Sequence, residues 1–166
     1  SAQTAHEMAI LAMDQFGLLL CHLLDNSAAV RTLKEVVRSV RVGKLPVILP
    51  SSILLKPNPL NASWDVTSDT IAAYLGERLK ARRLILTTDV DGLFTEDPKT
   101  NPQARLLSTV RLDELSQFPT RTCVDSALPS QLRRYTLDTW IVSGLHPERV
   151  FGLLRGERTV STRILP

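Results

Sequence analysis

Cysteine is scarce in this sequence, since only Cys21 and Cys123 occur among its 166 residues. They lie far apart and form no CxxC pair, which argues against a zinc site or a thioredoxin-type motif. Both stand in apolar surroundings, which is typical of buried free thiols. A chain of this length can build a core without disulfides, so we expect a reducing, cytoplasmic setting.

Long uncharged hydrophobic runs are also missing. The most apolar stretch, residues 8–24, is interrupted by Asp14, Gln15 and His22, so it is too short and too polar to span a membrane. No basic segment precedes it and Glu7 intrudes, so we expect no signal peptide. The stretch predicts a helix that is buried in a core or in a subunit interface, and hence a homo-oligomer.

Neither sign of charge dominates the chain. Lys and Arg number 20 against 17 Asp and Glu, which gives a formal net charge of +3. This mild balance permits an anionic ligand but does not favour nucleic acid. Hydrophobic residues make up 43% and charged residues 22%, which is typical of a globular protein. The length predicts a single domain over residues 1–166.

Hydrophobic periodicity predicts alternating helices and strands. The expected helices span residues 4–26, 28–40, 67–80, 112–118, 126–135 and 147–154, and the expected strands span residues 46–50, 84–88, 139–143 and 160–165. Ser27 is expected to cap the second helix. Alternation of this kind favours an α/β fold with an open, mostly parallel sheet that helices cover.

In open α/β sheets, ligands bind beyond the carboxyl ends of the strands. A polar loop over residues 89–103 follows the strand at 84–88. The segment TTDVDGLFTEDPK, residues 87–99, covers the end of the strand and most of this loop. Its hydroxyls and backbone N–H groups can hold phosphate oxygens, Lys99 can neutralise them, and Phe94 can pack on an adenine. The alternative is a solvated turn, since Asp, Gly and Pro are common turn residues. An EF-hand is excluded, because the third ligand and the terminal Glu are missing.

A second segment, WDVTSDTIAA at residues 64–73, opens a helix that Thr67 or Ser68 is expected to cap. Ser68 and Asp69 stand at the helix start, where the partial positive charge favours anions. The alternative is that Asp69 simply completes the cap. Trp64 is either a core anchor or a wall of the site.

Taken together, these two segments resemble the amino acid kinase superfamily. The family pattern S/N-x-D-x-x-A-A-x-L-A/G corresponds to TSDTIAAYLG at residues 67–76, and the pattern T-D-V-D-G-L/V-F/Y-x-x-D-P-K corresponds to residues 88–99. The resemblance implies a three-layer αβα sandwich with an open, mostly parallel sheet. The wording around residues 5–15 and 64–69 is similar to the small kinases of methanofuran and methylofuran biosynthesis, whose acceptor is an aminomethylfuran phosphate.

The resemblance implies ATP as the phosphoryl donor, with Mg²⁺ bridging its phosphates. Asp69 would orient the catalytic groups, and Ser68 and Trp64 would bind a small carboxylate or phosphate acceptor. The nucleotide would be bound by the second motif, through Thr87, Thr88, Asp89, Asp91, Gly92, Leu93, Phe94, Asp97, Pro98 and Lys99. No metal site made by protein side chains alone is expected. Residues 51–61 and 120–126 are expected to shape the acceptor pocket.

The chain departs from the family in two places. Its seven glycines form no glycine-rich loop, whereas the family's first β-α unit carries the loops that cradle the transferred phosphoryl group. A segment that holds a catalytic lysine in many relatives here reads Val124, Asp125 and Ser126. The glycine-rich loops are therefore expected from a preceding segment or from a second chain. The alternative function is a non-catalytic module that binds or stores a nucleotide or oxyanion.

Overall fold

The computed structural model describes residues 1–56, 59–118 and 123–166. They form two compact units, Ser1–Trp64 and Asp65–Pro166. Part of the expected acceptor loops, Pro57 and Asn58 in one and residues 120–122 in the other, lies outside the described residues. The expectation of a single domain over residues 1–166 stays a prediction, because compactness does not decide whether the two units fold together.

The first unit holds two parallel strands and the helices that pack on them. Its elements are α1 (Ala2–Leu23), β1 (Ser27–Val30), α2 (Leu33–Arg41), β2 (Leu45–Ile48) and α3 (Ser51–Leu54). The pairing runs from Ser27 beside Leu45 to Val30 beside Ile48. Asp14 of α1 accepts a hydrogen bond from the backbone N–H of Ser51 at 3.1 Å, so α1 and the start of α3 are held together.

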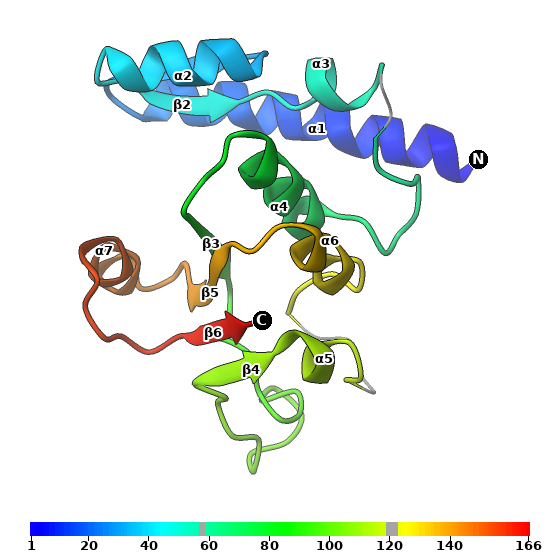
Figure 1. Cartoon of the computed structure of the whole chain (residues 1–166), viewed down its shortest axis with the longest axis vertical. Helices are drawn as coiled ribbons and strands as arrows, with labels where there is room; N and C mark the ends of the chain where they lie inside the picture. Colours follow the sequence, from blue (N-terminus) through cyan, green and yellow to red (C-terminus); the bar gives the residue numbers. More distant parts are fainter. Residues whose placement is uncertain (57–58, 119–122) are drawn as a thin grey trace. The chain divides into compact units, whose positions relative to one another are not determined.

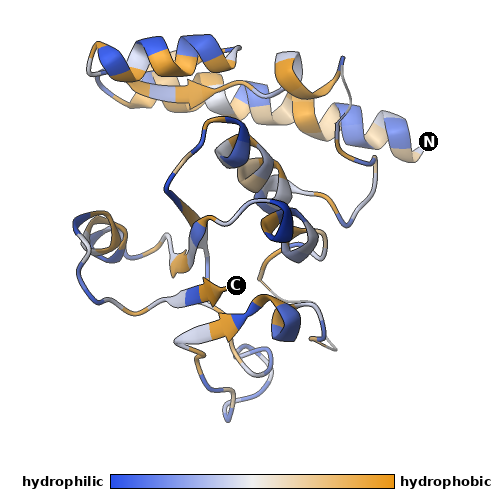
Figure 2. Ribbon diagram, in the orientation of Figure 1, coloured by the Kyte–Doolittle hydropathy of each residue, from blue (hydrophilic) through white to orange (hydrophobic). Residues whose placement is uncertain are grey.

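The expected helix over 28–40 with Ser27 as its cap was wrong in its first part. Residues 27–30 form β1, whose backbone groups pair with β2, and the Ser27 hydroxyl donates to the carbonyl of Leu24 at the end of α1. The true cap of α2 is Thr32, which forms a capping box with Glu35. Along α2 the ribbon alternates between hydrophilic and hydrophobic stretches (Figure 2).

The second unit holds a mixed sheet with helices on two sides. Its elements are α4 (Ser68–Arg78), β3 (Arg83–Thr88), β4 (Thr109–Arg111), α5 (Leu112–Leu115), α6 (Leu128–Arg134), β5 (Asp138–Ser143), α7 (Pro147–Arg155) and β6 (Thr162–Leu165). The strands lie in the order β3-β5-β6-β4. Figure 1 shows α7 on one side of β3 and β5, with α4 and α6 on the other.

This arrangement confirms the predicted α/β class with mostly parallel strands. The pairs β1–β2, β3–β5 and β4–β6 are parallel, and only β5–β6 is antiparallel among the pairs of the described chain. The core of the second unit is mainly apolar, with Ile141 fully buried on β5 and Leu128 fully buried on α6, and it also buries polar residues such as Thr139 and Thr162. A run of buried aliphatic residues on a central strand is typical of a sheet covered on both faces.

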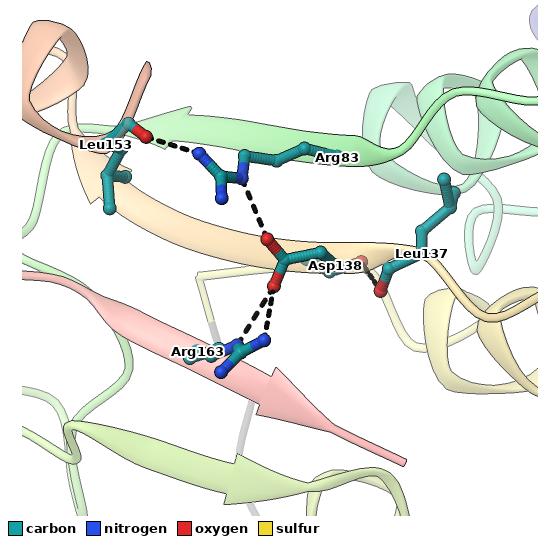
Figure 3. A network of polar contacts seen from close by, with 6 residues as sticks. Arg83, Leu137, Asp138, Leu153 and Arg163 are labelled. Carbon is teal, nitrogen blue, oxygen red and sulfur yellow. Dashed lines mark hydrogen bonds and ion pairs between the residues drawn. The ribbon is translucent and has the colours of Figure 1, made fainter. Parts of the chain in front are cut away.

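Charged side chains join three strands of this sheet at one place (Figure 3). Asp138 of β5 accepts hydrogen bonds from Arg83 of β3 at 2.8 Å and from Arg163 of β6 at 2.9 Å. Arg83 also donates to the carbonyl of Leu153, next to the end of α7. Burial pulls the pKa of Asp138 upward, but the hydrogen bonds from the two arginines outweigh burial and leave that pKa below its usual value.

We expect Asp138→Asn to lower the free energy of unfolding by about 1–2 kcal/mol, because both arginines lose a charged acceptor. Since the pKa of Asp138 is depressed by folding, its contribution is present at neutral pH and is lost as the pH falls through the folded-state pKa. Urea denaturation at pH 7 and at pH 3 measures both effects. Asp113→Asn is the control, because the Asp113–Arg133 pair is mostly exposed and should contribute under about 0.5 kcal/mol.

Candidate functional site

The carboxyl ends of β3 and β5 meet at one edge of the sheet, where the loop at residues 89–107 begins. Thr88 pairs with Ser143 in the strand register, and the backbone N–H of Gly144 donates to the carbonyl of Thr88 at 2.8 Å. Both strands end there in parallel, so the loops that follow them start side by side. This is the place where open α/β sheets bind ligands.

Backbone hydrogen bonds cross the loop after β3, while its residues 95–97 and 99–100 are exposed to solvent. It folds back on itself through an antiparallel bridge between Phe94 and Leu106. The backbone N–H of Leu107 donates to the carbonyl of Leu93 at 2.8 Å, and that of Asn101 donates to the carbonyl of Asp97 at 2.9 Å. These bonds hold the TTDVDGLFTEDPK segment in one conformation beside the sheet.

Gly92 lets this loop approach β6 closely. Its φ is +151°, and a Cβ placed there would lie 2.5 Å from Oγ1 of Thr162. Thr162 is fully buried. Its hydroxyl accepts from the backbone N–H of Leu93 at 2.8 Å and donates to the carbonyl of Leu107 at 2.6 Å. Thr162 thus ties both sides of the loop to the sheet, a role that the sequence did not reveal.

The loop encloses a pocket of about 270 Å³. Residues that the sequence predicted for nucleotide binding line it, namely Asp89, Gly92, Leu93, Phe94, Asp97, Pro98 and Lys99. Three further lining residues, Val90, Glu96 and Phe118, were not predicted, and Cys123 belongs to the segment 120–126 that was expected to shape the acceptor pocket instead. Phe118 and Cys123 follow Phe94 by more than twenty positions, so no local pattern connects them with the loop. The lining combines the aromatic side chains of Phe94 and Phe118 with charged side chains such as Asp89 and Lys99.

Lys99 and Asp89 form an ion pair at the pocket, with 2.6 Å between Nζ and Oδ2. The hydrogen bond and the charge of Lys99 lower the pKa of Asp89, and the same contact raises the pKa of Lys99. Both groups are therefore ionised at neutral pH. Both side chains are about two-thirds exposed, so water screens the pair and Lys99 can leave Asp89 for another anion.

Three predicted nucleotide-binding residues, Thr87, Thr88 and Asp91, do not line this pocket. Asp91 instead forms an ion pair with Arg149 of α7, a partner that the sequence did not suggest. Thr88 ends β3, and its hydroxyl lies 3.4 Å from the Asp89 carboxylate. These residues frame the loop's start, and any contact that they make with a ligand stays a prediction.

Asp69 lies in the first turn of α4, as expected. Its carboxylate accepts a hydrogen bond from the backbone N–H of Asp125 at 3.0 Å. Burial raises the pKa of Asp69, and the negative charge of Asp125 adds to that rise, although the hydrogen bond from Asp125 opposes it. The side chain of Ser68 also donates to Asp69. A carboxylate with a raised pKa at the mouth of a helix is typical of functional sites.

Cys123 connects Asp69 with the pocket. Burial raises the pKa of the Cys123 thiol to about 11, and the negative charges of Asp69 and Asp89 add to the rise. Cys123 also lines the pocket. Trp64 belongs to the other compact unit and its side chain is 82% exposed; its predicted role toward an acceptor stays a prediction.

The N-cap of α4 is Thr67, one of the two residues that the sequence predicted, but the acceptor of the hydrogen bonds at the cap is a distant side chain. Thr67 is the N-cap but makes no side-chain cap bond. The Asp125 carboxylate accepts instead from the backbone N–H groups of Thr67 and Thr70, each at 2.9 Å. The idea that Asp69 completes the cap was therefore wrong, because Asp125 occupies that position.

Within residues 1–56, 59–118 and 123–166, no group of three or more His, Cys, Asp and Glu side chains is placed to hold a metal ion. No helix in the same residues is both long enough and apolar enough to cross a membrane.

Proteins of similar sequence indicate the family to which this chain belongs. The sequence profile of the amino acid kinase family matches residues 3–134. The (5-(aminomethyl)furan-3-yl)methyl phosphate kinase of Methanocaldococcus jannaschii is 32% identical over 165 residues, which cover 99% of this chain and 73% of that protein. The uridylate kinase of Thermofilum pendens is 33% identical over 105 residues, or 59% of this chain and 45% of that protein.

Solved structures agree on the fold. The UMP kinase of Ureaplasma parvum superposes with a TM-score of 0.77 at 14% identity and covers all of this chain, which spans 73% of that protein. The uridylate kinase of Archaeoglobus fulgidus gives 0.75 at 21% identity over 99% of this chain and 73% of its own. The resemblance that the two motifs suggested is thus confirmed, and the chain belongs to the amino acid kinase family.

Proposed function

We propose that the protein transfers a phosphoryl group from ATP to a small phosphate-bearing acceptor. The observation that carries this proposal is the pocket at the carboxyl end of β3, which Phe94 and the Asp89–Lys99 ion pair line. Phosphoryl transfer needs little covalent chemistry from a protein and depends on positioning and on neutralising charge. A pocket with an apolar wall for the base and a lysine for the phosphates is suited to that task.

The volume and walls of the pocket fit part of a nucleotide. Small-molecule pockets in proteins measure about 300–1,000 Å³, so 270 Å³ suits a base and its ribose. Phe94 and Phe118 give aromatic faces on which an adenine can stack. In this proposal the phosphates extend from the pocket toward Lys99, Thr87 and Thr88, and Asp91 lies by the ribose.

Charge at the pocket favours a bound divalent cation together with the phosphates. Asp89, Glu96 and Asp97 face a single lysine, Lys99, in the lining, so a bare polyphosphate would meet net negative charge. Mg²⁺ is usually held by one or two carboxylates plus the phosphates of its substrate, and Asp89 and Asp97 are suited to that. When bound, Mg²⁺ would neutralise phosphate charge during transfer.

The acceptor is proposed from chemistry and relationship together. The relative from Methanocaldococcus jannaschii acts on an aminomethylfuran methyl phosphate, and we propose an acceptor of that kind for this protein. Ser68 is exposed beside Asp69, and in this proposal its hydroxyl turns from Asp69 to donate to a phosphate oxygen of the acceptor. The role of Trp64 toward the acceptor, which the family resemblance implied, is part of the same proposal. The protein is further proposed to act as a homo-oligomer or with a second chain that supplies glycine-rich loops.

Lys99→Ala is expected to weaken ATP binding about tenfold while the affinity for the acceptor stays within about twofold, because Lys99 contributes one charge to the nucleotide phosphates only. Isothermal titration with each ligand measures the two affinities. Arg105→Ala is the control, because Arg105 lies in the same loop but not in the pocket lining. Equal ATP affinity of the Lys99 variant and the parent would refute the role of Lys99.

The proposed function is tested by following ADP release from the complete protein with Mg·ATP and an aminomethylfuran methyl phosphate. Release that requires the acceptor supports phosphoryl transfer. Tight ATP binding without ADP release, across several phosphate-bearing acceptors, would favour a binding or storage module instead. Absence of both binding and release would refute the nucleotide site altogether.

A further inference from the structure

Asp125 occupies a position that unites two parts of the site. Its carboxylate accepts five hydrogen bonds, from the backbone N–H and hydroxyl of Thr67, the backbone N–H and hydroxyl of Thr70, and the backbone N–H of Leu128. One side chain therefore closes the N-terminus of α4 and the first turn of α6 together. Thr67 and Asp125 are 58 positions apart in the sequence.

Asp125 also binds Asp69, through its backbone rather than its side chain. The backbone N–H of Asp125 donates to Oδ2 of Asp69 at 3.0 Å, while its side chain fixes the residues on either side of Asp69, Thr67 and Thr70. Asp69 is thus held at its backbone through the capped turn and at its carboxylate through the N–H of Asp125. Thr70 is 2% exposed, so water does not compete for its contact with Asp125.

A purely structural cap would not need this arrangement. Most helix caps are Ser, Thr, Asp or Asn at the N-cap itself, and here Thr67 stands at the N-cap of α4 without making that bond. Asp125 places a second carboxylate next to the partly buried Asp69, a like-charge contact that costs stability. That cost is understandable where the position and protonation of one carboxylate matter, as they do at a site of reaction.

We propose that Asp125 is a positioning residue for phosphoryl transfer, which fixes the Asp69 carboxylate through its backbone N–H and through the turn of α4 that its side chain holds. The inference rests on the proposed function. Asp125 does not itself line the pocket, so we place its effect on the reaction in its contacts with Asp69. The charge of Asp125 also helps to raise the pKa of Asp69, next to the larger effect of burial.

The test is Asp125→Asn in the complete protein, which keeps the size of the side chain and removes its charge. We expect kcat to fall on the order of 10- to 100-fold, as small displacements of catalytic groups do, with KM for ATP within about twofold because the nucleotide pocket is untouched. The acid limb of the kcat/KM profile should also move to lower pH, because the charge next to Asp69 is gone. Among the described residues, Asp125 is the charged group that shifts the pKa of Asp69, and the nearby Cys123 thiol, whose pKa is raised to about 11, stays neutral in that range.

Glu35→Gln serves as the matched control, since Glu35 forms the capping box of α2 in the first unit and its loss should lower the melting temperature without changing kcat. If Asp125→Asn does not fold, Thr70→Val is measured in its place. It removes the hydrogen bond from the Thr70 hydroxyl to Asp125 and leaves the charge of Asp125 unchanged. If the parent is active and both the Asp125 and the Thr70 variants have its kcat and its acid limb in the kcat/KM profile, the inference is overturned. The proposed function is then unaffected. A parent that transfers no phosphoryl group overturns both.

Discussion

Gly92→Ala is expected to destroy the nucleotide pocket and to lower the free energy of unfolding by about 2–4 kcal/mol, since overpacking and backbone strain combine. The added Cβ would lie 2.5 Å from Oγ1 of Thr162 and 3.1 Å from both the Thr162 backbone nitrogen and a methyl carbon of Leu106. The backbone of Thr162 belongs to β6, which pairs with β5 and β4, so it has little room to move. The φ of +151° adds to the cost, because residues with a side chain rarely adopt it.

We expect ATP affinity to fall in this variant even under conditions where the protein stays folded. Thr162 ties Leu93 and Leu107 to the sheet, so a displaced Thr162 releases both sides of the pocket loop. Urea denaturation gives the stability, and ATP titration below the unfolding midpoint gives the affinity. Gly43→Ala is the control, because Gly43 has a φ of +72° with no neighbouring atom within 4 Å of its added Cβ, and it should cost only about 1–2 kcal/mol. Wild-type ATP affinity in the Gly92 variant would contradict the loop's assigned role.

Asp69→Asn is expected to abolish turnover, with kcat reduced on the order of a thousandfold, because a preorganised charge at the transferring group is lost. ATP affinity should stay within about threefold, since Asp69 does not line the pocket. Stability at neutral pH should be unchanged or higher. Folding raises the pKa of Asp69, so keeping this carboxylate ionised disfavours the folded state, and a neutral Asn removes that effect while still accepting from the Asp125 N–H.

The same raised pKa predicts the pH dependence of the parent. If the ionised form of Asp69 is required, kcat/KM falls as the pH drops through a value above the ordinary 3.8. ADP release across pH 4 to 8, with calorimetry for ATP binding, separates this effect from loss of nucleotide. Turnover of Asp69→Asn within a few-fold of the parent would show that Asp69 is not the catalytic carboxylate.

The sequence predicted the elements around the site well because their patterns are local. The helix at α4, the strand at β3 and the polar loop after it follow one another within residues 67–99, and each has its own periodicity or turn residues. The structure confirms these elements to within a few residues. It likewise confirms the strand at β5 and the helix at α7, whose end is marked by Gly156 in a left-handed conformation.

The sequence failed where short segments depend on distant partners. The four residues of β1 become a strand because β2 pairs with them, whereas Ser-Ala-Ala-Val alone reads equally well as a helix start. The three residues of β4 are too short for a periodicity and depend on β6. The partners of Asp69 and Asp91 are Asp125 and Arg149, each more than fifty residues away, and no spacing in a single sequence connects them.

The central claim is that the loop after β3 forms the nucleotide site. The most direct test is hydrogen–deuterium exchange of the complete protein at short labelling times, with Mg·ATP at about a hundred times its Kd, where binding adds about 2.7 kcal/mol of stability. The account predicts slower exchange in peptides that cover residues 87–99 and 123–125, with residues 33–41 of α2 unchanged. If Mg·ATP slows exchange elsewhere while residues 87–99 exchange as fast as in the free protein, the loop after β3 is not the nucleotide site.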